Sequence, residues 1–180
     1  MVNIAEITEK ITIPDGASAT YQNNILTIKG EKGELSRSFV YPKINIKING
    51  NVIEINSKNV RRKEKALIGT YVAHINNMLK GVTEGFEYKM RTVFSHFPIK
   101  TSVDQNEFII QNFLGERSAR RAKILEGVNV EVKGEDITVQ GINKESVGQT
   151  VANIERATKV KKRDIRVFQD GVYRINKGGK

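Results

Sequence analysis

Ile44-Asn-Ile-Lys-Ile-Asn-Gly50-Asn-Val-Ile-Glu-Ile55 is the stretch that decides the fold, because apolar and polar residues alternate on both sides of a glycine. Alternation with a period of two is typical of a strand that has one buried face and one solvated face. A glycine between two such runs indicates a β-hairpin, and Asn49-Gly50 is a favourable pair for its turn. The sequence therefore predicts two paired antiparallel strands here.

The same pattern returns 84 residues later as Val128-Asn-Val-Glu-Val-Lys-Gly134-Glu-Asp-Ile-Thr-Val139. Two further pairs of segments agree, in the same order and at nearly the same spacing. Gly69-Thr-Tyr-Val72-Ala-His-Ile75 resembles Gly148-Gln-Thr-Val151-Ala-Asn-Ile154, and Asn24-Ile-Leu-Thr-Ile28 resembles Asn106-Glu-Phe-Ile-Ile110. We interpret the chain as an internal duplication. The alternative is two hairpin-helix units that converged.

Each half also contains one stretch with apolar residues at helical spacing. In the first half the apolar positions between residues 66 and 79 fall on one face, with Asn59 as a candidate N-cap and Gly81 as a candidate stop. In the second half apolar residues from Val147 to Ile154 mark a shorter helix, and Asn143 is its candidate cap.

Together these elements predict an α+β fold of two duplicated domains, each an antiparallel β-sheet with one packed α-helix. We place the domains at residues 1–82 and 83–180, with a strand pair over Phe86–Phe97 opening the second. Gly69 and Gly148 lie inside the helices, at a cost of about 1 kcal/mol each relative to alanine. A close approach of helix to sheet would explain both glycines, and simple tolerance of glycine at these positions is the alternative.

The composition favours a polyanionic partner. The 180 residues include 30 Lys and Arg against 20 Asp and Glu, for a formal net charge of +10. A field of this sign attracts nucleic acid or an anionic membrane, but the chain has no lipidation site and no basic amphipathic helix. The first thirty residues lack an apolar core of signal-peptide length, and no run reaches transmembrane length. We therefore expect a cytoplasmic protein that binds no membrane.

Signals for catalysis are poor. The chain has no cysteine, which removes disulfides, thiolate catalysis and cysteine-based zinc sites. His74 and His96 stand alone in the sequence, and no metal-ligand spacing or phosphate-binding loop occurs. We predict no catalytic residue, no metal, no cofactor and no small-molecule substrate. An enzyme with its cleft between the two domains is the remaining alternative in this class.

Basic residues gather in the second half. Residues 155–180 alone carry a net charge of +6, and a second group of cations follows residues 112–116. Lys and Arg that neutralise phosphates release condensed counterions, and Arg adds bidentate phosphate contacts. The predicted RNA-binding residues are Arg117, Arg120, Arg121, Lys123, Lys159, Lys161, Lys162, Arg163, Arg166, Arg174, Lys177 and Lys180.

A smaller basic group opens the first helix, at Arg61, Arg62, Lys63 and Lys65. Cations at a helix N-terminus oppose the macrodipole, at a cost of roughly 0.3–1 kcal/mol. An external anion would offset that cost, and the carboxylate of Glu64 could offset part of it. Contact with RNA and simple solvation of the surface are equally good interpretations.

Several motifs resemble those of the large-subunit ribosomal protein six family in its archaeal and eukaryotic form. The run Gly141-Ile-Asn-Lys-Glu-Ser-Val-Gly-Gln-Thr150 with Ala152-Asn-Ile-Glu155 is the most specific, and Asn112-Phe-Leu-Gly-Glu-Arg117 and Phe168-Gln-Asp-Gly171 flank it. In the first half Gly81-Val-Thr-Glu-Gly85 carries the likeness. The resemblance spans nearly the whole chain.

The resemblance implies a structural constituent of the large ribosomal subunit with two similar α+β domains and no catalytic residues. It implies binding of large-subunit ribosomal RNA, mainly through the second domain and C-terminal segment, near the sarcin–ricin loop, the factor-binding region and the stalk base. Neighbouring ribosomal proteins are the other implied partners. A free-standing RNA-binding regulator is the alternative, although the aromatic pattern of an RNP-type sheet is missing from Glu84-Gly-Phe-Glu-Tyr88.

Overall fold

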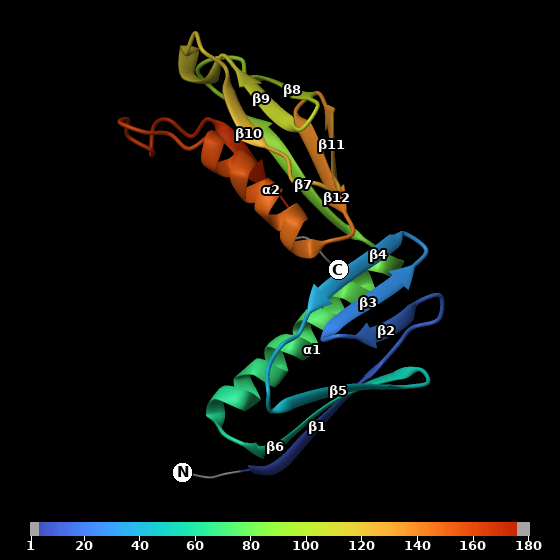
Figure 1. Ribbon diagram of the computed structural model, residues 1–180. Coiled ribbons are helices and arrows are strands. Elements are labelled where there is room, and N and C mark those ends of the chain that lie inside the picture. Colours follow the sequence, from blue (N-terminus) through green and yellow to red (C-terminus); the bar gives the residue numbers. More distant parts are fainter. Residues whose placement is uncertain (1–3, 176–180) are drawn as a thin grey trace. The chain divides into compact units, whose positions relative to one another are not determined.

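The structure, a computed structural model, describes residues 4–175, apart from the side chains of residues 4, 5 and 59. The chain divides into two compact units between Gly85 and Phe86, three residues after the boundary expected from the sequence. Each unit contains antiparallel strands and one long helix (Figure 1). The α+β class is therefore confirmed.

The first unit holds six strands and one helix, arranged as two three-stranded antiparallel sheets. One sheet has the order β1-β6-β5 and the other has the order β2-β3-β4. The elements are β1 (Ile4–Thr12), β2 (Ser18–Gln22), β3 (Ile25–Gly30), β4 (Gly33–Ser38), β5 (Ile44–Asn49), β6 (Val52–Val60) and α1 (Arg62–Thr83).

The second unit repeats this plan and adds one strand at the end. Its sheets have the orders β11-β12-β7-β13 and β10-β9-β8. A short 3-10 turn at Phe113–Gly115 precedes β10. The elements are β7 (Phe86–Val93), β8 (Lys100–Asp104), β9 (Glu107–Gln111), β10 (Arg120–Lys123), β11 (Val128–Lys133), β12 (Asp136–Gly141), α2 (Lys144–Ala157) and β13 (Gly171–Arg174).

Matching topology confirms the duplication predicted from the repeat. The order β5-β6-β1 corresponds to β11-β12-β7, and β2-β3-β4 corresponds to β8-β9-β10. The sequence predicted one sheet per unit, whereas the structure splits the strands of each unit between two sheets. A strand pair was expected over Phe86–Phe97, but β7 is a single strand that ends at Val93 and pairs with β12 and β13.

The two repeated hairpins share one register. Asn49 pairs with Val52 and Lys133 pairs with Asp136, so each loop has two residues and begins at a glycine. Gly50 and Gly134 adopt φ values of 58° and 64°, which only glycine reaches at little cost. The expected Asn49-Gly50 turn is therefore shifted by one residue, because Asn49 still belongs to β5.

Each helix packs its apolar face against strands of both sheets of its own unit. Helix α1 contacts β1 and β6 of one sheet and β3 and β4 of the other. Its buried face includes Ile68, Ile75 and Val82, at the helical spacing expected from the sequence. The second unit has a separate core in which Val147, Val151 and Ile154 of α2 face the sheets.

The helix ends and internal glycines differ from the sequence-based expectations. Strand β6 runs on to Val60 and the cap of α1 is Arg61, so the predicted cap at Asn59 is wrong. The helix passes the predicted stop at Gly81 and ends at Thr83. The sheet contact expected at Gly69 and Gly148 is wrong as well: a Cβ would meet nothing within 4 Å at Gly69, and only the Tyr88 hydroxyl at 4.0 Å at Gly148.

Candidate nucleic-acid interface

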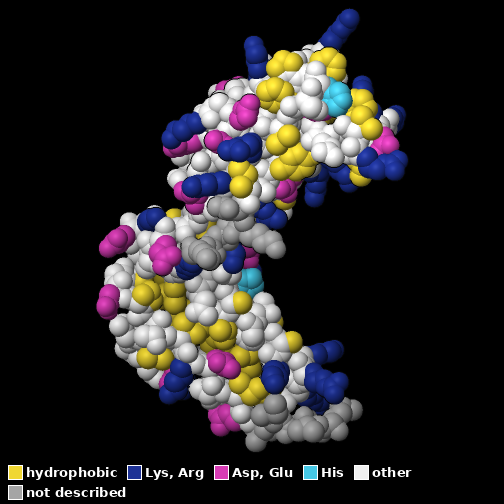
Figure 2. All heavy atoms as spheres, turned by 180° about the vertical axis from the view of Figure 1, so that it is seen from behind, with side chains coloured by type: hydrophobic (Ala, Val, Ile, Leu, Met, Phe, Trp, Pro, Cys, Tyr) yellow, Lys and Arg dark blue, Asp and Glu magenta, His cyan; other side chains and the backbone are white. Residues whose placement is uncertain are grey.

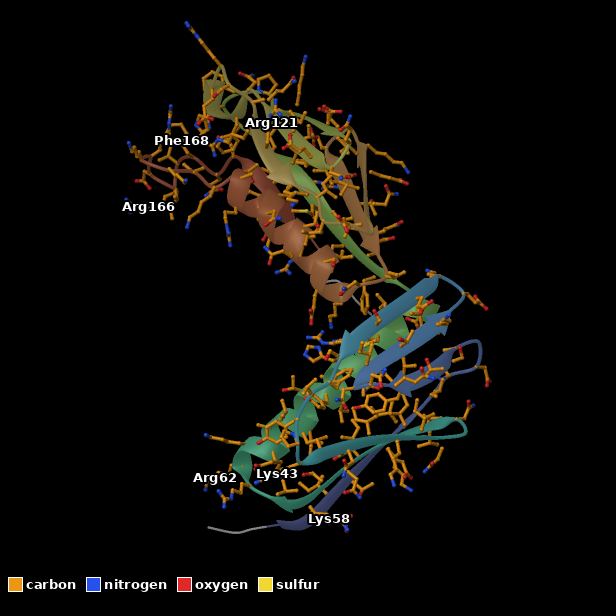
Figure 3. The ribbon with its side chains drawn as sticks, in the orientation of Figure 1. Lys43, Lys58, Arg62, Arg121, Arg166 and Phe168 are labelled. Carbon is orange, nitrogen blue, oxygen red and sulfur yellow. The ribbon has the colours of Figure 1, made fainter. Side chains whose placement is uncertain are left out.

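The main cluster of predicted RNA-binding residues lies in the loop of residues 159–170, which we call the basic loop. It leaves the C-terminal end of α2, projects away from the sheets and returns to form β13 (Figure 1). Figure 3 shows Arg166 and Phe168 on this loop. All five of its cations are exposed: Lys159, Lys161, Lys162, Arg163 and Arg166.

Local sequence explains where α2 begins and ends, and so where the basic loop starts. The Asn143 side chain accepts a hydrogen bond from the Glu145 amide at 3.0 Å, as expected of an N-cap. The helix ends at Ala157, and the Thr158 hydroxyl then accepts a hydrogen bond from the Val172 amide at 3.1 Å. The two stems of the basic loop are therefore joined to each other.

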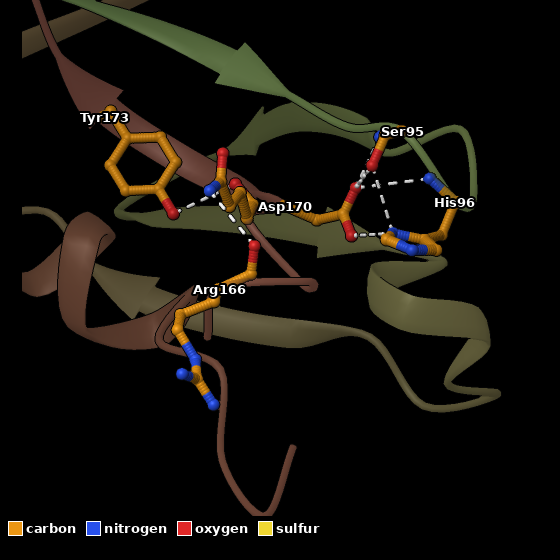
Figure 4. A network of polar contacts seen from close by, with 6 residues as sticks. Ser95, His96, Arg166, Asp170 and Tyr173 are labelled. Atoms are coloured by element: carbon orange, nitrogen blue, oxygen red, sulfur yellow. Dashed lines mark hydrogen bonds and ion pairs between the residues drawn. The ribbon is translucent and has the colours of Figure 1, made fainter. Parts of the chain in front are cut away.

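A buried polar contact attaches the base of the loop to the segment after β7 (Figure 4). Asp170 is only 1% exposed and accepts hydrogen bonds from the backbone amides of Ser95 and His96. His96 Nδ1 lies 2.7 Å from Asp170 Oδ2, and the His96 ring stacks on Phe168 with centroids 4.5 Å apart. Burial raises the pKa of Asp170, but these hydrogen bonds outweigh it and lower the pKa below the ordinary value.

Ser95, His96 and Asp170 come together without forming a catalytic triad. The Ser95 hydroxyl lies 3.1 Å from His96 Nδ1, the same nitrogen that contacts Asp170. A triad histidine uses its two nitrogens for the two partners, so that one accepts a proton while the other is held. This histidine therefore supports the loop. Among residues 4–175, no group of three or more His, Asp or Glu side chains is placed to hold a metal ion.

Arg120 differs from the other predicted RNA-binding residues because it points inward. It shares the face of β10 that carries buried Ala122. Its guanidinium group donates two hydrogen bonds to Glu116, at 2.6 and 2.8 Å, and two to the carbonyls of Ala157 and Lys159. Its Cζ also lies 4.2 Å from the centre of the Phe113 ring. Arg120 thus satisfies carbonyls at the end of α2 and fixes the start of the basic loop.

The outward face of β10 carries Arg121 and Lys123, which alternate with the buried face. Arg121 forms a cross-strand ion pair with Glu107 at 3.0 Å and remains 66% exposed. Figure 3 shows Arg121 on this strand. An exposed pair of this kind is screened by solvent and leaves the guanidinium accessible to a stronger anion.

Three further arginines have partners but stay at the surface. Arg166 donates to Asp164, and this hydrogen bond lowers the pKa of the Asp164 carboxyl. The Cζ of Arg163 lies 4.8 Å from the centre of the Phe168 ring, a cation–π contact. Arg174 of β13 lies 6.0 Å from the centre of the Tyr88 ring. Lys177 and Lys180 lie outside the described residues.

Five predicted residues are exposed and have neither an ion pair with a carboxylate nor a contact with an aromatic ring in the described chain: Arg117, Lys123, Lys159, Lys161 and Lys162. Figure 2 shows Lys and Arg side chains projecting from the surface of the second unit. Three of the five follow the C-terminal end of α2, where the helix dipole favours cations. The surface therefore presents positive charge that the protein itself leaves uncompensated.

Apolar side chains are mixed with these cations. Ile165 is 69% exposed and Val167 is 59% exposed, both within the basic loop. A groove of about 660 Å³ lies under the loop, lined by the last turns of α2, the loop itself and β13. Exposed apolar side chains that gather in one place are a feature of contact surfaces. Neither helix in the described part of the chain is long and apolar enough to cross a membrane.

Sequence reasoning missed the residues that support the loop. Asp170 lies in the run Phe168-Gln-Asp-Gly171, but His96 is 74 positions away and nothing in the sequence indicates that the two residues meet. The inward orientation of Arg120 could have been predicted from the sequence. Arg120 lies two positions before Ala122, a small apolar residue, and residues two apart in a strand share one face. Period two in this short run indicates that one of the two adjacent arginines faces the core.

Comparison with known proteins gives one consistent result. The family model for ribosomal protein L6 matches residues 13–85 and again residues 97–171, once in each unit. The large ribosomal subunit protein uL6 of Methanobrevibacter smithii is 51% identical over 98% of this chain and 99% of its own length. The proteins of the same name from Methanothrix thermoacetophila and Methanosarcina mazei are 48% and 45% identical, each over 97% of this chain and 99% of its own length.

Proposed function

Because this chain belongs to the ribosomal protein L6 family, we propose that it acts by holding large-subunit ribosomal RNA through its second unit. It is a structural constituent of the large ribosomal subunit in the cytoplasm and not an enzyme. Its partners are large-subunit ribosomal RNA and neighbouring ribosomal proteins. Its contribution to translation is therefore passive: it fixes RNA that must keep one shape.

The exposed, uncompensated cations of the second unit carry this proposal. The basic loop is anchored at both stems by Thr158, Asp170 and Arg120, so its cations are presented on a supported scaffold. Supported cations bind phosphates with less loss of side-chain and loop entropy than free ones do. The contacts are mainly to phosphate, which positions the protein without reading sequence. Exposed Ile165 and Val167 offer apolar contact to a neighbouring protein or to RNA.

The proposed location on the subunit is the region of the sarcin–ricin loop, the factor-binding region and the stalk base. This part of the proposal rests on the resemblance of residues 141–155 and their flanking motifs to the family. Chemical footprinting of large subunits assembled with and without the protein tests it. Protection confined to RNA outside this region would contradict the location, and would leave the RNA-binding proposal intact.

Replacing Lys161, Lys162 and Arg163 together with alanine tests the role of the basic loop. Each lost phosphate contact reduces the slope of log affinity against log salt by about 1, so we expect the slope to fall by about 3. Binding to large-subunit RNA is measured by fluorescence anisotropy across a salt series. Replacing Lys10, Lys29 and Lys47 of the first unit removes the same charge and is the matched control.

Equal effects of the two triple variants would mean that only total charge matters, and would contradict a role for the basic loop. Co-sedimentation with large subunits from a lysate separates the ribosomal role from that of a free RNA-binding regulator. A protein that bound RNA in solution but never sedimented with the subunit would favour the regulator.

A further inference from the structure

A second group of cations surrounds the start of α1 in the first unit. We call it the first-unit basic patch, and its six exposed members are Lys43, Lys58, Arg61, Arg62, Lys63 and Lys65. They come from three places in the fold: the loop before β5, the end of β6, and the cap and first turn of α1. Figure 3 shows Lys43, Lys58 and Arg62 at the same end of the unit, and Figure 2 shows Lys and Arg gathered there.

The acidic residue within the patch is already engaged by the protein. Glu64 is 4% exposed, and its carboxylate accepts hydrogen bonds from the Arg61 amide at 3.0 Å and the Tyr41 hydroxyl at 3.2 Å. Lys43 Nζ lies 3.7 Å from the same carboxylate. Backbone hydrogen bonds, its own amide first, hold the pKa of Glu64 below its ordinary value. Glu64 can therefore compensate one cation, while the other five have no ion pair with a carboxylate among residues 4–175.

The position of the patch is unfavourable for the isolated protein. The N-terminal end of a helix carries positive partial charge, so cations there are repelled by the helix dipole. The backbone amides of Arg62 and Lys63, in the first turn of α1, have no acceptor in the described part of the chain. Amide donors and cations converging at one helix start are suited to bind phosphate.

The second unit shows that the fold does not need this charge. Its α2 begins with one cation and one carboxylate, Lys144 and Glu145, after the Asn143 cap. By hairpin register, the positions equivalent to Lys43 and Lys58 are Gly127 and Ile142. The same fold thus forms with a single cation at the start of its helix, so stability does not explain the other cations of the first unit.

We propose that the first-unit basic patch is a second RNA-binding surface, which contacts the phosphate backbone separately from the basic loop. A nucleic-acid backbone fits better than an acidic protein segment because the patch residues are all cations with no apolar anchor among them. Protein interfaces have an apolar or aromatic centre, whereas phosphate contacts do not require one. This inference rests on the proposed function, and assigns the first unit a direct share in RNA binding.

The test compares full-length variants that lose equal charge from the first unit. The patch variant changes Arg61, Arg62, Lys63 and Lys65 to glutamine. The control variant changes four lysines that lie outside the patch to glutamine: Lys10, Lys29, Lys47 and Lys80. A third variant changes Lys159, Lys161, Lys162 and Arg163 of the basic loop. Affinity for large-subunit RNA is measured across a salt series, and thermal unfolding checks that each variant is folded.

We expect the patch variant to bind at least tenfold more weakly than the control near 0.1 M salt, with a slope of log affinity against log salt smaller by about 4, or about 1 for each lost contact. Its unfolding midpoint should equal or exceed that of the unchanged protein, because the removed cations oppose the helix dipole. A patch variant that binds like the control, while the basic-loop variant loses affinity, overturns this inference and leaves the proposed function standing. Failure of the unchanged protein to bind RNA overturns the proposed function.

A competitor distinguishes the two kinds of polyanion. Polyglutamate is added at the same total charge as ribosomal RNA, and displacement of labelled RNA is followed for the unchanged protein and the patch variant. Weaker competition by polyglutamate than by RNA supports a phosphate surface. Stronger competition by polyglutamate that disappears in the patch variant identifies an acidic protein segment as the partner, and overturns the assignment to RNA.

Discussion

At the scale of single residues, two adjacent arginines show how one residue type takes two roles. Arg120 and Arg121 follow each other in β10, yet Arg120 is held by four hydrogen bonds within the protein and Arg121 by one exposed ion pair. Alternation along a strand separates them, because successive side chains point to opposite faces. We therefore infer that Arg120 positions the basic loop, whereas Arg121 belongs to the exposed surface that can contact RNA.

Replacing Arg120 with alanine should lower the free energy of unfolding by about 2 kcal/mol, because Glu116 and two carbonyls lose their donor. Replacing Arg121 with alanine should change it by less than about 1 kcal/mol, the usual range for an exposed pair. Urea unfolding followed by circular dichroism measures both. Equal losses in the two variants would contradict the inward role of Arg120.

Asp170 makes part of the stability depend on pH. Its pKa is lowered in the folded protein, so the folded state binds fewer protons than the unfolded chain near the ordinary Asp value of about 3.9. Its contribution is therefore complete above that value, and is lost as the pH falls through the folded pKa. Glu116 and Asp164 have lowered pKa values for the same kind of reason.

Replacing Asp170 with asparagine isolates this contribution. At pH 7 we expect a loss of about 1–2 kcal/mol, since hydrogen bonds to a charged acceptor become bonds to a neutral one. As the pH falls from 5 to below about 3.9, the difference in free energy of unfolding between the two proteins should become smaller. The reason is that only the unchanged protein has this carboxyl to protonate. Urea unfolding at several pH values checks the trend. A gap that stays constant would contradict the role of the charge.

At the scale of elements, glycines at strand ends allow close packing, whereas the glycine inside α1 does not. A Cβ on Gly141, at the end of β12, would lie 2.7 Å from Val147 Cγ2 and 2.9 Å from the carbonyl oxygen of Gly127. A Cβ on Gly30, at the end of β3, would lie 2.7 Å from the Val82 carbonyl oxygen. The close approach of helix to sheet thus occurs at strand ends, and the helical Gly69 faces open space.

Alanine substitutions at Gly69 and Gly141 should therefore have opposite signs. Gly69→Ala should raise the free energy of unfolding by about 0.5–1 kcal/mol, because alanine restricts the unfolded chain and suits a helix. Gly141→Ala should lower it by about 1–3 kcal/mol, because the new methyl group overpacks the contact with α2. Thermal and urea unfolding measure both values. A destabilised Gly69→Ala would mean that this position is packed.

At the scale of the whole molecule, the chain is two units with separate cores. The core of the first unit centres on residues such as Ile53 and Ile55, and that of the second on residues such as Ile137 and Val139. No buried residue belongs to both clusters within the described chain. Each unit can therefore lose stability on its own, which is the usual behaviour of regions with independent cores.

Hydrogen exchange tests this independence. In the Gly141→Ala variant, amides of β11 and β12 should exchange faster, while the amides of Ile53 and Ile55 in β6 keep the protection of the unchanged protein. Mass spectrometry of peptic fragments from both units provides the measurement. A parallel loss of protection in the two units would show that they unfold together.

Much of the fold could be predicted because it depends on local patterns. Alternation in residues 44–55 and 128–139 predicted both hairpins, and the helical spacing of apolar residues predicted α1 and α2. The division into two sheets per unit could not be predicted, because period two reports which face of a strand is buried and not which strand is its neighbour. The start of α1 was misplaced because the cap residue is Arg61, whose backbone amide donates a hydrogen bond to Glu64, three residues after it.

The sequence by itself determined the duplication, the strand and helix types, the excess of positive charge and the family. All of these depend on residue identity and on spacing along the chain. Only the tertiary structure decided which cations are free, since Arg120 turns inward and Lys161 and Lys162 do not. It also joined Asp170 to His96 across 74 positions. The physical reason is that ion pairs and burial depend on which strands lie next to each other. Strands that are distant in the sequence become neighbours only when the whole unit folds.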